Sequence, residues 1–146
     1  MAGRRSRNKG KRGEREIINA LQPVVDRVCA EVGADAVVLE RNLLQAHSGG
    51  CDVYGLEWLS MEVKRQENGS GLGSWWRQTL QQARADQTPV LVWRANRQPW
   101  RVRMRVPVRV GSGAGAKLVT ATVDVDWDSF LVYFETRVRY ELTKGV

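Results

Sequence analysis

Residues 49–64 read GGCDVYGLEWLSMEVK, and their alternation predicts two antiparallel strands that reverse about Glu57. In this register Asp52 lies opposite Glu62, and the side chains separate by chemistry. One face carries Cys51, Val53, Leu59, Met61 and Val63, and the other carries Asp52, Tyr54, Ser60, Glu62 and Lys64. A shift of one residue would mix polar and apolar side chains on both faces.

The opposed carboxylates of Asp52 and Glu62 indicate a metal site. Directly opposed residues of a strand pair have Cβ atoms roughly 4.5–5.5 Å apart, where like charges repel unless a cation neutralises them. Mg²⁺ prefers carboxylate and water oxygens, together with substrate phosphate. Lys64 extends from the same face and could orient a water molecule or contact the scissile phosphate. The pattern favours phosphodiester cleavage; the alternative is an exposed strand face that carries three charges and no catalytic role.

Length and composition predict a single domain with a basic surface. The chain has 146 residues, a net charge of +7 and a pI of about 10.0, which favours a polyanionic partner, either nucleic acid or an anionic membrane surface. There is no long apolar run and no signal peptide, so we expect no membrane anchor and a cytoplasmic location. Cys29 and Cys51 are expected to be buried free thiols. The chain has no GxxxxGK[ST] motif, so no nucleotide cofactor is expected.

The amino terminus is strongly basic. Residues 1–12 lack apolar periodicity, and we predict a flexible arm that contacts DNA phosphates, followed by a single domain over residues 13–146. The alternative is a tail that only increases solubility. Phosphate contacts would make DNA binding depend steeply on salt concentration, whereas a tail that only increases solubility would not.

A helix is predicted from Gly13 and Glu14 onward by apolar residues spaced three and four apart, from Ile17 to Val32. Pro23 is expected to kink or split it. Glu14 falls on the apolar side of this helix. Its carboxylate either complements the helix dipole at the first turn or supplies a third acidic group to the metal site.

The segment that follows is predicted to be a first strand over residues 36–39 and then a loop that leads into Asp52. His47 in this loop could be a general base or a phosphate contact, although a lone loop histidine commonly has neither role. Ser74 is expected to cap a helix that ends near Ala85. Its inner stripe is expected to comprise Trp76, Leu80 and Ala83.

The sequence leaves the roles of two residue pairs on this helix undecided, one pair of tryptophans and one pair of glutamines. Adjacent Trp75 and Trp76 cannot both face the core, so one of them either contacts a dimer partner or DNA, or packs at the flank of the helix. Gln78 and Gln82 share a face and are suggested to line the cleft.

The carboxyl-terminal half predicts three strands and a helix. Residues 89–93 form a wholly apolar run typical of a central strand, and residues 100–106 alternate strictly, with Arg101, Arg103 and Arg105 on one side. This arginine stripe either follows DNA or protects an edge strand from aggregation. Residues 111–116 are expected to be a flexible linker, residues 117–125 a strand, and residues from Trp127 a helix capped by Asp126 or Asp128. The order of elements predicts an α/β fold with a mixed central β-sheet flanked by helices.

The motifs together resemble a known superfamily. Lys9-Gly10, Gly13-Glu14-Arg15-Glu16, then Asp52, then Glu62-Val63-Lys64 are similar to the PD-(D/E)XK nucleases, and most similar to the archaeal-type Holliday junction resolvases that also occur in phages. The resemblance covers roughly residues 8–95, and Cys51 stands where the motif has proline. It implies a restriction-endonuclease-like fold and a homodimer.

The resemblance also implies roles for residues. Glu14, Asp52 and Glu62 would surround the metal, and Lys64 would be catalytic. The residues expected to contact DNA are Arg4, Arg5, Arg7, Lys9, Lys11, Arg12, Arg15, Arg41, His47, Ser48 and Arg65.

These observations lead to one functional prediction and two alternatives. We predict an endonuclease that uses Mg²⁺, for which Mn²⁺ is expected to substitute, and that resolves branched four-way DNA junctions by paired symmetric nicks. One alternative is another PD-(D/E)XK nuclease of nicking, repair or restriction type. The other is a basic DNA-binding protein without catalysis.

Overall fold

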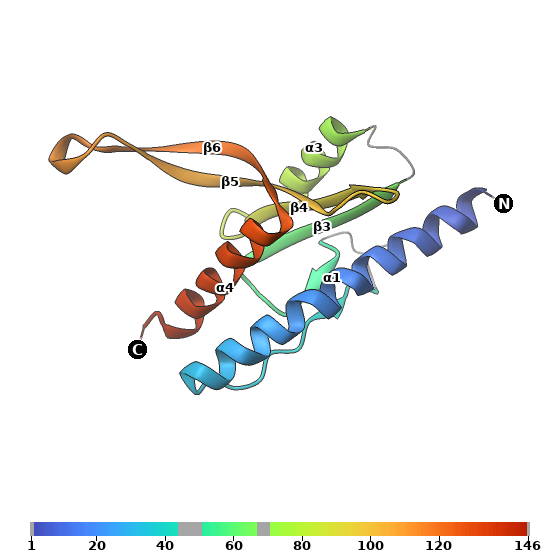
Figure 1. The fold of residues 1–146 in the computed structure, drawn as a ribbon, viewed down its shortest axis with the longest axis horizontal. Helices are drawn as coiled ribbons and strands as arrows, with labels where there is room; N and C mark the ends of the chain where they lie inside the picture. The colour runs from blue at the N-terminus through green and yellow to red at the C-terminus, as the bar shows by residue number, and fades with distance from the viewer. Residues whose placement is uncertain (1, 44–50, 67–70, 146) are drawn as a thin grey trace.

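The computed structural model describes residues 2–43, 51–66 and 71–145, with side chains from Lys11 onward (Figure 1). The elements in chain order are α1 (Ala2–Val32), β1 (Glu40–Arg41), β2 (Val53–Tyr54), β3 (Leu59–Gln66), α3 (Leu72–Gln82), β4 (Thr88–Ala95), β5 (Arg101–Val110), the 3₁₀ turn η1 (Gly113–Gly115), β6 (Lys117–Asp126) and α4 (Trp127–Thr143).

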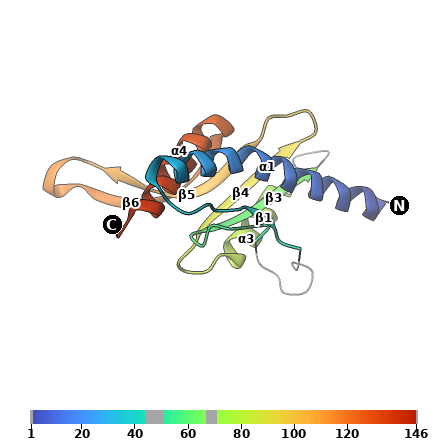
Figure 2. The same cartoon turned by 90° about the horizontal axis from the view of Figure 1, so that it is seen from below.

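A mixed four-stranded sheet in the order β3-β4-β5-β6 forms the centre of the molecule. β3 and β4 are parallel, and the other neighbours are antiparallel. Helices α1 and α4 cover one face of the sheet and α3 lies on the other, as Figures 1 and 2 show from two directions. The structure confirms the predicted α/β architecture with a mixed sheet flanked by helices, which is consistent with a restriction-endonuclease-like fold.

The hydrophobic core lies between the sheet and the α1–α4 layer. Ile17, Leu21, Val25 and Val28 of α1 are buried at the predicted helical spacing. The core-facing side chains of the sheet and of α4 that meet them are Met61, Val63, Val90, Val92, Val102, Met104, Phe130, Phe134 and Val138. The wholly apolar run on β4 is therefore an internal strand, as predicted, and Cys29 and Cys51 are buried free thiols.

Helix α1 differs from the sequence prediction at its start and at Pro23. It begins at Ala2 and continues through Pro23 as one element, so the backbone of the segment expected to be a flexible arm is helical. Arg, Lys and Ala favour helix, and adding residues to an anchored helix costs little once its first turn exists. The boundary between an arm and a domain at residue 12 remains a prediction.

Two other elements are placed differently from the prediction. The first strand lies at Glu40–Arg41 and not at residues 36–39. Helix α3 begins one turn before the expected cap: Gly71 is its N-cap, with φ of 98°, and Ser74 lies inside the helix, where its hydroxyl donates to the Gly71 carbonyl. The predicted inner stripe is also wrong: Trp75 and Thr79 face inward, while Trp76, Leu80 and Ala83 are half-buried.

The carboxyl-terminal elements lie where they were predicted, although β5 continues to Val110, four residues beyond the predicted strand. β5 and β6 form a long antiparallel hairpin whose outer part extends away from the rest of the sheet (Figure 1). Its tip, expected to be a flexible linker, contains η1. Asp126 caps α4 by accepting the amide hydrogen of Ser129 at 3.2 Å. None of the helices among the described residues could span a lipid bilayer.

The arginine stripe of β5 does not lie on an edge strand, because β6 covers β5 and is itself the edge. Arg103 donates two hydrogen bonds to Asp124, at 2.6 and 2.8 Å, and its guanidinium stacks over Trp93. Arg101 lies opposite Asp126 in the same register. The interpretation of the stripe as protection of an edge is therefore wrong.

Candidate active site

Asp52 is held against the middle of β3 by hydrogen bonds on both sides of Glu62. Its backbone amide donates to the Met61 carbonyl at 2.8 Å, and its Oδ2 accepts the amide hydrogen of Val63 at 2.7 Å. β2 pairs with β1 and not with β3, so the expected regular hairpin between the two strands is wrong. Residues 52 and 62 are nevertheless close together, as predicted. The two hydrogen bonds of Asp52 to β3 take the place of the regular strand-to-strand hydrogen bonds of a hairpin.

The reversal that joins β2 to β3 depends on Gly55. Its φ is 125°, and a Cβ built on it would lie 2.6 Å from the Val38 carbonyl oxygen. A side chain at this position would strain the backbone and clash with the segment before β1. Glycine therefore permits the turn that brings Asp52 to β3.

The apolar face predicted for this stretch is confirmed, since Cys51, Val53, Leu59, Met61 and Val63 are all buried. On the predicted polar face Tyr54 is exposed, but the two carboxylates and Ser60 are buried. Asp52, Ser60 and Glu62 are 4%, 1% and 0% exposed. Helix α3 packs on this side of β3 and β4.

Burial and charge together perturb Glu62. Removal from water raises its pKa to about 9, with repulsion from Asp52 as the next cause. Lys64 opposes this shift, and its Nζ lies 3.9 Å from Glu62 Oε2. Asp52, Glu62 and Lys64 thus form one electrostatically connected group.

Glu14 approaches the same group from α1. Its carboxylate accepts a hydrogen bond from Arg41 Nε at 2.8 Å. Burial raises its pKa, the Arg41 hydrogen bond lowers it, and the Asp52 charge raises it. Because α1 begins at Ala2, Glu14 is not in the first turn, so the explanation by the helix dipole is wrong.

The donor set fits a divalent cation, although the described residues contain no group of three or more acidic, histidine or cysteine side chains that could hold one. Asp52 and Glu62 are buried carboxylates that repel each other, and a cation would relieve this repulsion. The Arg41 hydrogen bond occupies Oε2 of the Glu14 carboxylate. The place of Glu14 in the metal site remains a prediction.

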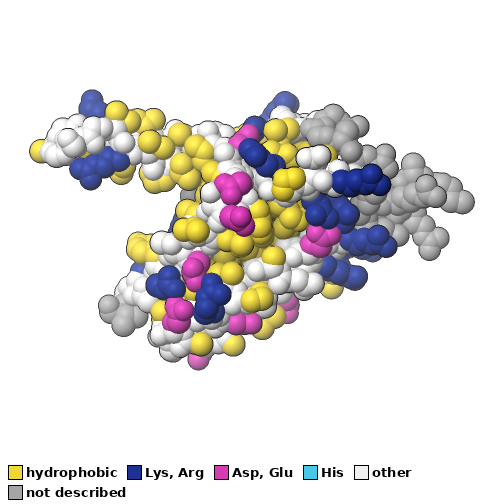
Figure 3. All heavy atoms as spheres, viewed as in Figure 1, with side chains coloured by type: hydrophobic (Ala, Val, Ile, Leu, Met, Phe, Trp, Pro, Cys, Tyr) yellow, Lys and Arg dark blue, Asp and Glu magenta, His cyan; other side chains and the backbone are white. Residues whose placement is uncertain are grey.

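Exposed basic residues lie on α1 on both sides of Glu14. Lys11, Arg12 and Arg15 are exposed, and Figure 3 shows Lys and Arg side chains gathered at this end of the molecule. The side chains of Arg4, Arg5, Arg7 and Lys9, and all of His47 and Ser48, lie outside the described residues, so their DNA contacts remain predictions.

Three interactions near the site were not predicted from the sequence. Glu16 Oε1 accepts hydrogen bonds from both Arg65 and Arg94, at 2.9 and 3.0 Å. Asn42 donates to the Cys51 carbonyl at 2.9 Å and so fixes the residue next to Asp52. Asn42 directly follows β1, but the sequence placed that strand at residues 36–39 and so gave no signal for this contact. No local signal connects Glu16 to arginines on two different strands.

Comparison with known protein families identifies the family of this chain. The family described as "Phage putative PDDEXK endonuclease" matches residues 5–139. The chain belongs to this family. No curated protein matches the chain, and no solved structure matches it.

Membership of the phage PDDEXK endonuclease family places the chain in the PD-(D/E)XK nuclease superfamily and confirms that part of the resemblance. Nucleases of this superfamily generally use divalent metals. The assignment of Asp52, Glu62 and Lys64 to the motif of this superfamily remains a prediction.

Proposed function

We propose that the protein is a Mg²⁺-dependent, structure-selective endonuclease that resolves four-way DNA junctions by paired symmetric nicks. The observation that carries the nuclease proposal is the buried Asp52–Glu62 pair with the Lys64 ammonium 3.9 Å from Glu62. Such a pair is costly to bury without a cation, and an enzyme site accounts for that cost.

Each residue has a defined task in this proposal. Asp52 and Glu62 hold the cation, with Glu14 nearby. The bound ion lowers the pKa of a water molecule and stabilises charge that develops on phosphate oxygens. Lys64 orients the attacking water or neutralises charge on the phosphate, because its ammonium is a compact donor on the same side of β3. The exposed cations of α1 hold the DNA backbone.

Symmetry motivates the junction as substrate. A four-way junction has two-fold symmetry, and a two-fold dimer presents two equivalent sites to it. A single small domain could then make both nicks. The host cytoplasm is the proposed location of a phage-encoded nuclease.

The second candidate is a different DNA endonuclease with the same catalytic group, of nicking, repair or restriction type. The family description supports this candidate, because it specifies an endonuclease without a branched substrate. The catalytic residues are shared by both candidates, so substrate preference distinguishes them.

The test uses a labelled four-way junction and a linear duplex that contains the same arm sequences, each with Mg²⁺, Mn²⁺ or EDTA. We expect paired symmetric nicks in the junction with either metal, no cleavage of the duplex and no cleavage in EDTA. Asp52→Asn should lower the cleavage rate by about a hundredfold or more while junction binding is retained.

The matched control is Asp35→Asn, which changes an exposed aspartate and should leave cleavage unchanged. Equal cleavage of duplex and junction would refute the junction proposal and leave the second candidate. Metal-independent cleavage, or full activity of Asp52→Asn, would refute both.

A further inference from the structure

The arginines of β5 lie on the face of the sheet that carries Glu62 and Lys64. Residues paired across neighbouring strands share a face, and Lys64 pairs with Trp93, which in turn pairs with Arg101. Glu62 is connected in the same way to Arg103, two strands away. Because neighbouring strands are roughly 4.8 Å apart, the backbone of Arg101 lies about 10 Å from that of Lys64. The arginines therefore continue directly from the candidate active site.

Helix α3 packs on β3 and β4 and leaves β5 open on this face. Arg101, Arg105 and Arg109 are exposed. The opposite face of β5 is buried at Val102 and Met104 against the core. β5 thus presents its arginines to solvent next to α3, on the side of the sheet where the candidate active site lies.

The charges on this face are only partly compensated. Strands β5 and β6 place six charged residues on it: Arg101, Arg103, Arg105, Arg109, Asp124 and Asp126. Asp124 pairs with Arg103, and both carboxylate oxygens of Asp126 accept hydrogen bonds from Ser129 at the start of α4. The other three arginines form no ion pair within the described part of the chain. These six residues together carry a net charge of +2.

The two faces of the hairpin differ where it extends beyond the body of the sheet (Figure 1). Residues 105–121 contain three basic residues and no acidic one. Arg105 and Arg109 continue the face that carries Lys64, whereas Lys117 pairs with Val110 and so lies on the opposite face, among valines. The hairpin therefore offers a row of cations on one face and a single exposed cation on the other.

The length of this row fits a polymer of phosphates better than one small anion. Arg101 and Arg109 are eight residues apart, which is about 26 Å along β5 at roughly 3.3 Å per residue. A DNA duplex rises roughly 3.4 Å per base pair, so the row matches about eight base pairs of one duplex arm. Guanidinium groups suit phosphate oxygens because they donate in a planar, bidentate arrangement.

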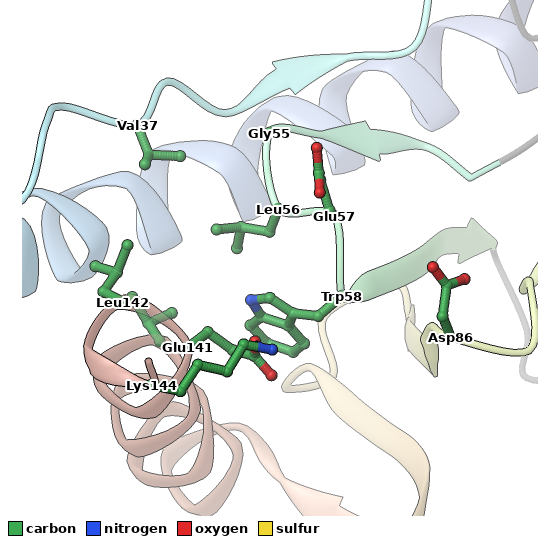
Figure 4. A pocket seen from close by; sticks show the side chains of 10 residues that line it. Val37, Gly55, Leu56, Glu57, Trp58, Asp86, Glu141, Leu142 and Lys144 are labelled. Carbon is green, nitrogen blue, oxygen red and sulfur yellow. The ribbon is translucent and has the colours of Figure 1, made fainter. Parts of the chain in front are cut away.

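The pocket near the start of β3 does not offer a comparable surface. It has a volume of about 430 Å³ and lies where the last turns of α4 meet the turn before β3 (Figure 4). Its charged lining residues are Glu57, Asp86, Glu141 and Lys144. It therefore lacks the excess of positive charge that attracts a polyanion, in contrast to the exposed face of β5.

We propose that this face of β5 is a DNA-binding surface that holds the phosphate backbone of a duplex arm as the arm leaves the active site. Arg101 meets the phosphates nearest the cut, and Arg105 and Arg109 meet those farther along the same arm. Arg103 stays paired with Asp124. The proposal rests on the proposed function for the position of the scissile phosphate beside Lys64, and it adds a second set of cations to those of α1.

Binding of the full-length protein to a fluorescent four-way junction, in EDTA and over a range of salt concentrations, tests this surface without cleavage. Arg105→Gln combined with Arg109→Gln should weaken binding by about three- to tenfold. It should also lower the magnitude of the slope of log K against log salt by about 2, since each cation that meets a phosphate contributes about 0.9.

Two further variants separate phosphate contacts from other effects. Arg105→Lys combined with Arg109→Lys keeps both charges and should retain the slope, which a purely structural role of the guanidiniums would not predict. Lys117→Gln is the matched control, because it removes an exposed cation from the opposite face of the same hairpin. It should leave both the affinity and the slope unchanged. Circular dichroism verifies that each variant is folded.

An unchanged slope in the variant with both glutamines would overturn the proposal. An equal loss in Lys117→Gln would also overturn it, because DNA would then respond to net charge and not to the face of the hairpin. Junction binding that depends on Arg105 and Arg109, without any cleavage in Mg²⁺, would refute the proposed function and leave the DNA-binding surface standing.

Discussion

Glu62 is the residue whose environment is hardest to explain by folding alone. Its side chain is fully buried beside Asp52, and its raised pKa means that the folded chain favours the neutral acid when no cation is present. A carboxylate in this position lowers stability and is expected where function requires it.

This raised pKa predicts how stability depends on pH in the metal-free protein. The pKa rises from an ordinary value of 4.5 to about 9, so folding takes up a proton between these limits and the free energy of unfolding falls as the pH rises. Glu62→Gln cannot ionise. It should be more stable to unfolding than wild type at pH 8 by several kcal/mol, at about 1.4 kcal/mol for each pH unit above 4.5, and the difference should disappear near pH 4.

Chemical denaturation in EDTA at several pH values measures this difference. Glu40→Gln, at an exposed position in β1, is the control and should follow the wild type at every pH. Adding Mg²⁺ should stabilise the wild type more than Glu62→Gln, because the ion binds only where the carboxylate is present. A variant less stable than wild type at pH 8 would contradict the assignment of Glu62 as a destabilising carboxylate.

At the residue scale, alternation in residues 49–64 was sufficient to bring Asp52 near Glu62, because polar and apolar positions separate in only one register. The same reasoning could not find the contact between Arg41 and Glu14 or the shared contact of Glu16 with Arg65 and Arg94. Those pairs depend on how α1 crosses the sheet, which local periodicity does not encode.

At the scale of elements, the turn between β2 and β3 controls whether the site forms. Gly55→Ala would place a methyl group against the Val38 carbonyl in a backbone conformation that alanine disfavours. We expect a loss of about 1–3 kcal/mol in the free energy of unfolding, together with loss of metal binding, measured by urea denaturation and calorimetry.

Gly73→Ala serves as its control. Gly73 lies in α3, and a Cβ there has no atom within 4 Å. Because alanine favours helix, this variant should be as stable as wild type or up to about 1 kcal/mol more stable, with metal binding intact. Equal stability of the two variants would argue against strain at Gly55.

The elements differ in how well their patterns specified them. β4, β5, β6 and α4 were predicted because each carries one unambiguous pattern, either a continuous apolar run, strict alternation or helical spacing beside an aspartate cap. Helix α3 offers two partly apolar faces, one with Trp75 and Thr79 and the other with Trp76 and Leu80. Packing against β3 and β4 selected the stripe that contains Trp75 and Thr79, which sequence periodicity did not distinguish.

At the scale of the whole molecule, α1 carries basic residues past the site on a continuous helix. Lys11→Gln combined with Arg12→Gln should weaken binding to junction and duplex alike. The change should also lower the magnitude of the slope of log K against log salt by about 2, since each cation that meets a phosphate contributes about 0.9. Fluorescence anisotropy on the Asp52→Asn background in EDTA measures this slope.

The control variant combines Arg27→Gln with Arg139→Gln and also removes two positive charges. Both guanidiniums are paired with glutamates on the surface formed by α1 and α4. This control should change the slope little. An unchanged slope in the Lys11 and Arg12 variant would show that this part of α1 does not meet DNA phosphates.

The amide of Val63 provides a way to follow the site without altering it. Its hydrogen is donated to the Asp52 carboxylate at 2.7 Å and not to a backbone carbonyl. Its nitrogen and proton resonances will therefore respond to any ion that arrives at that carboxylate. A single peak in a heteronuclear NMR spectrum of isotope-labelled native protein can in this way act as a titration indicator built into the strand.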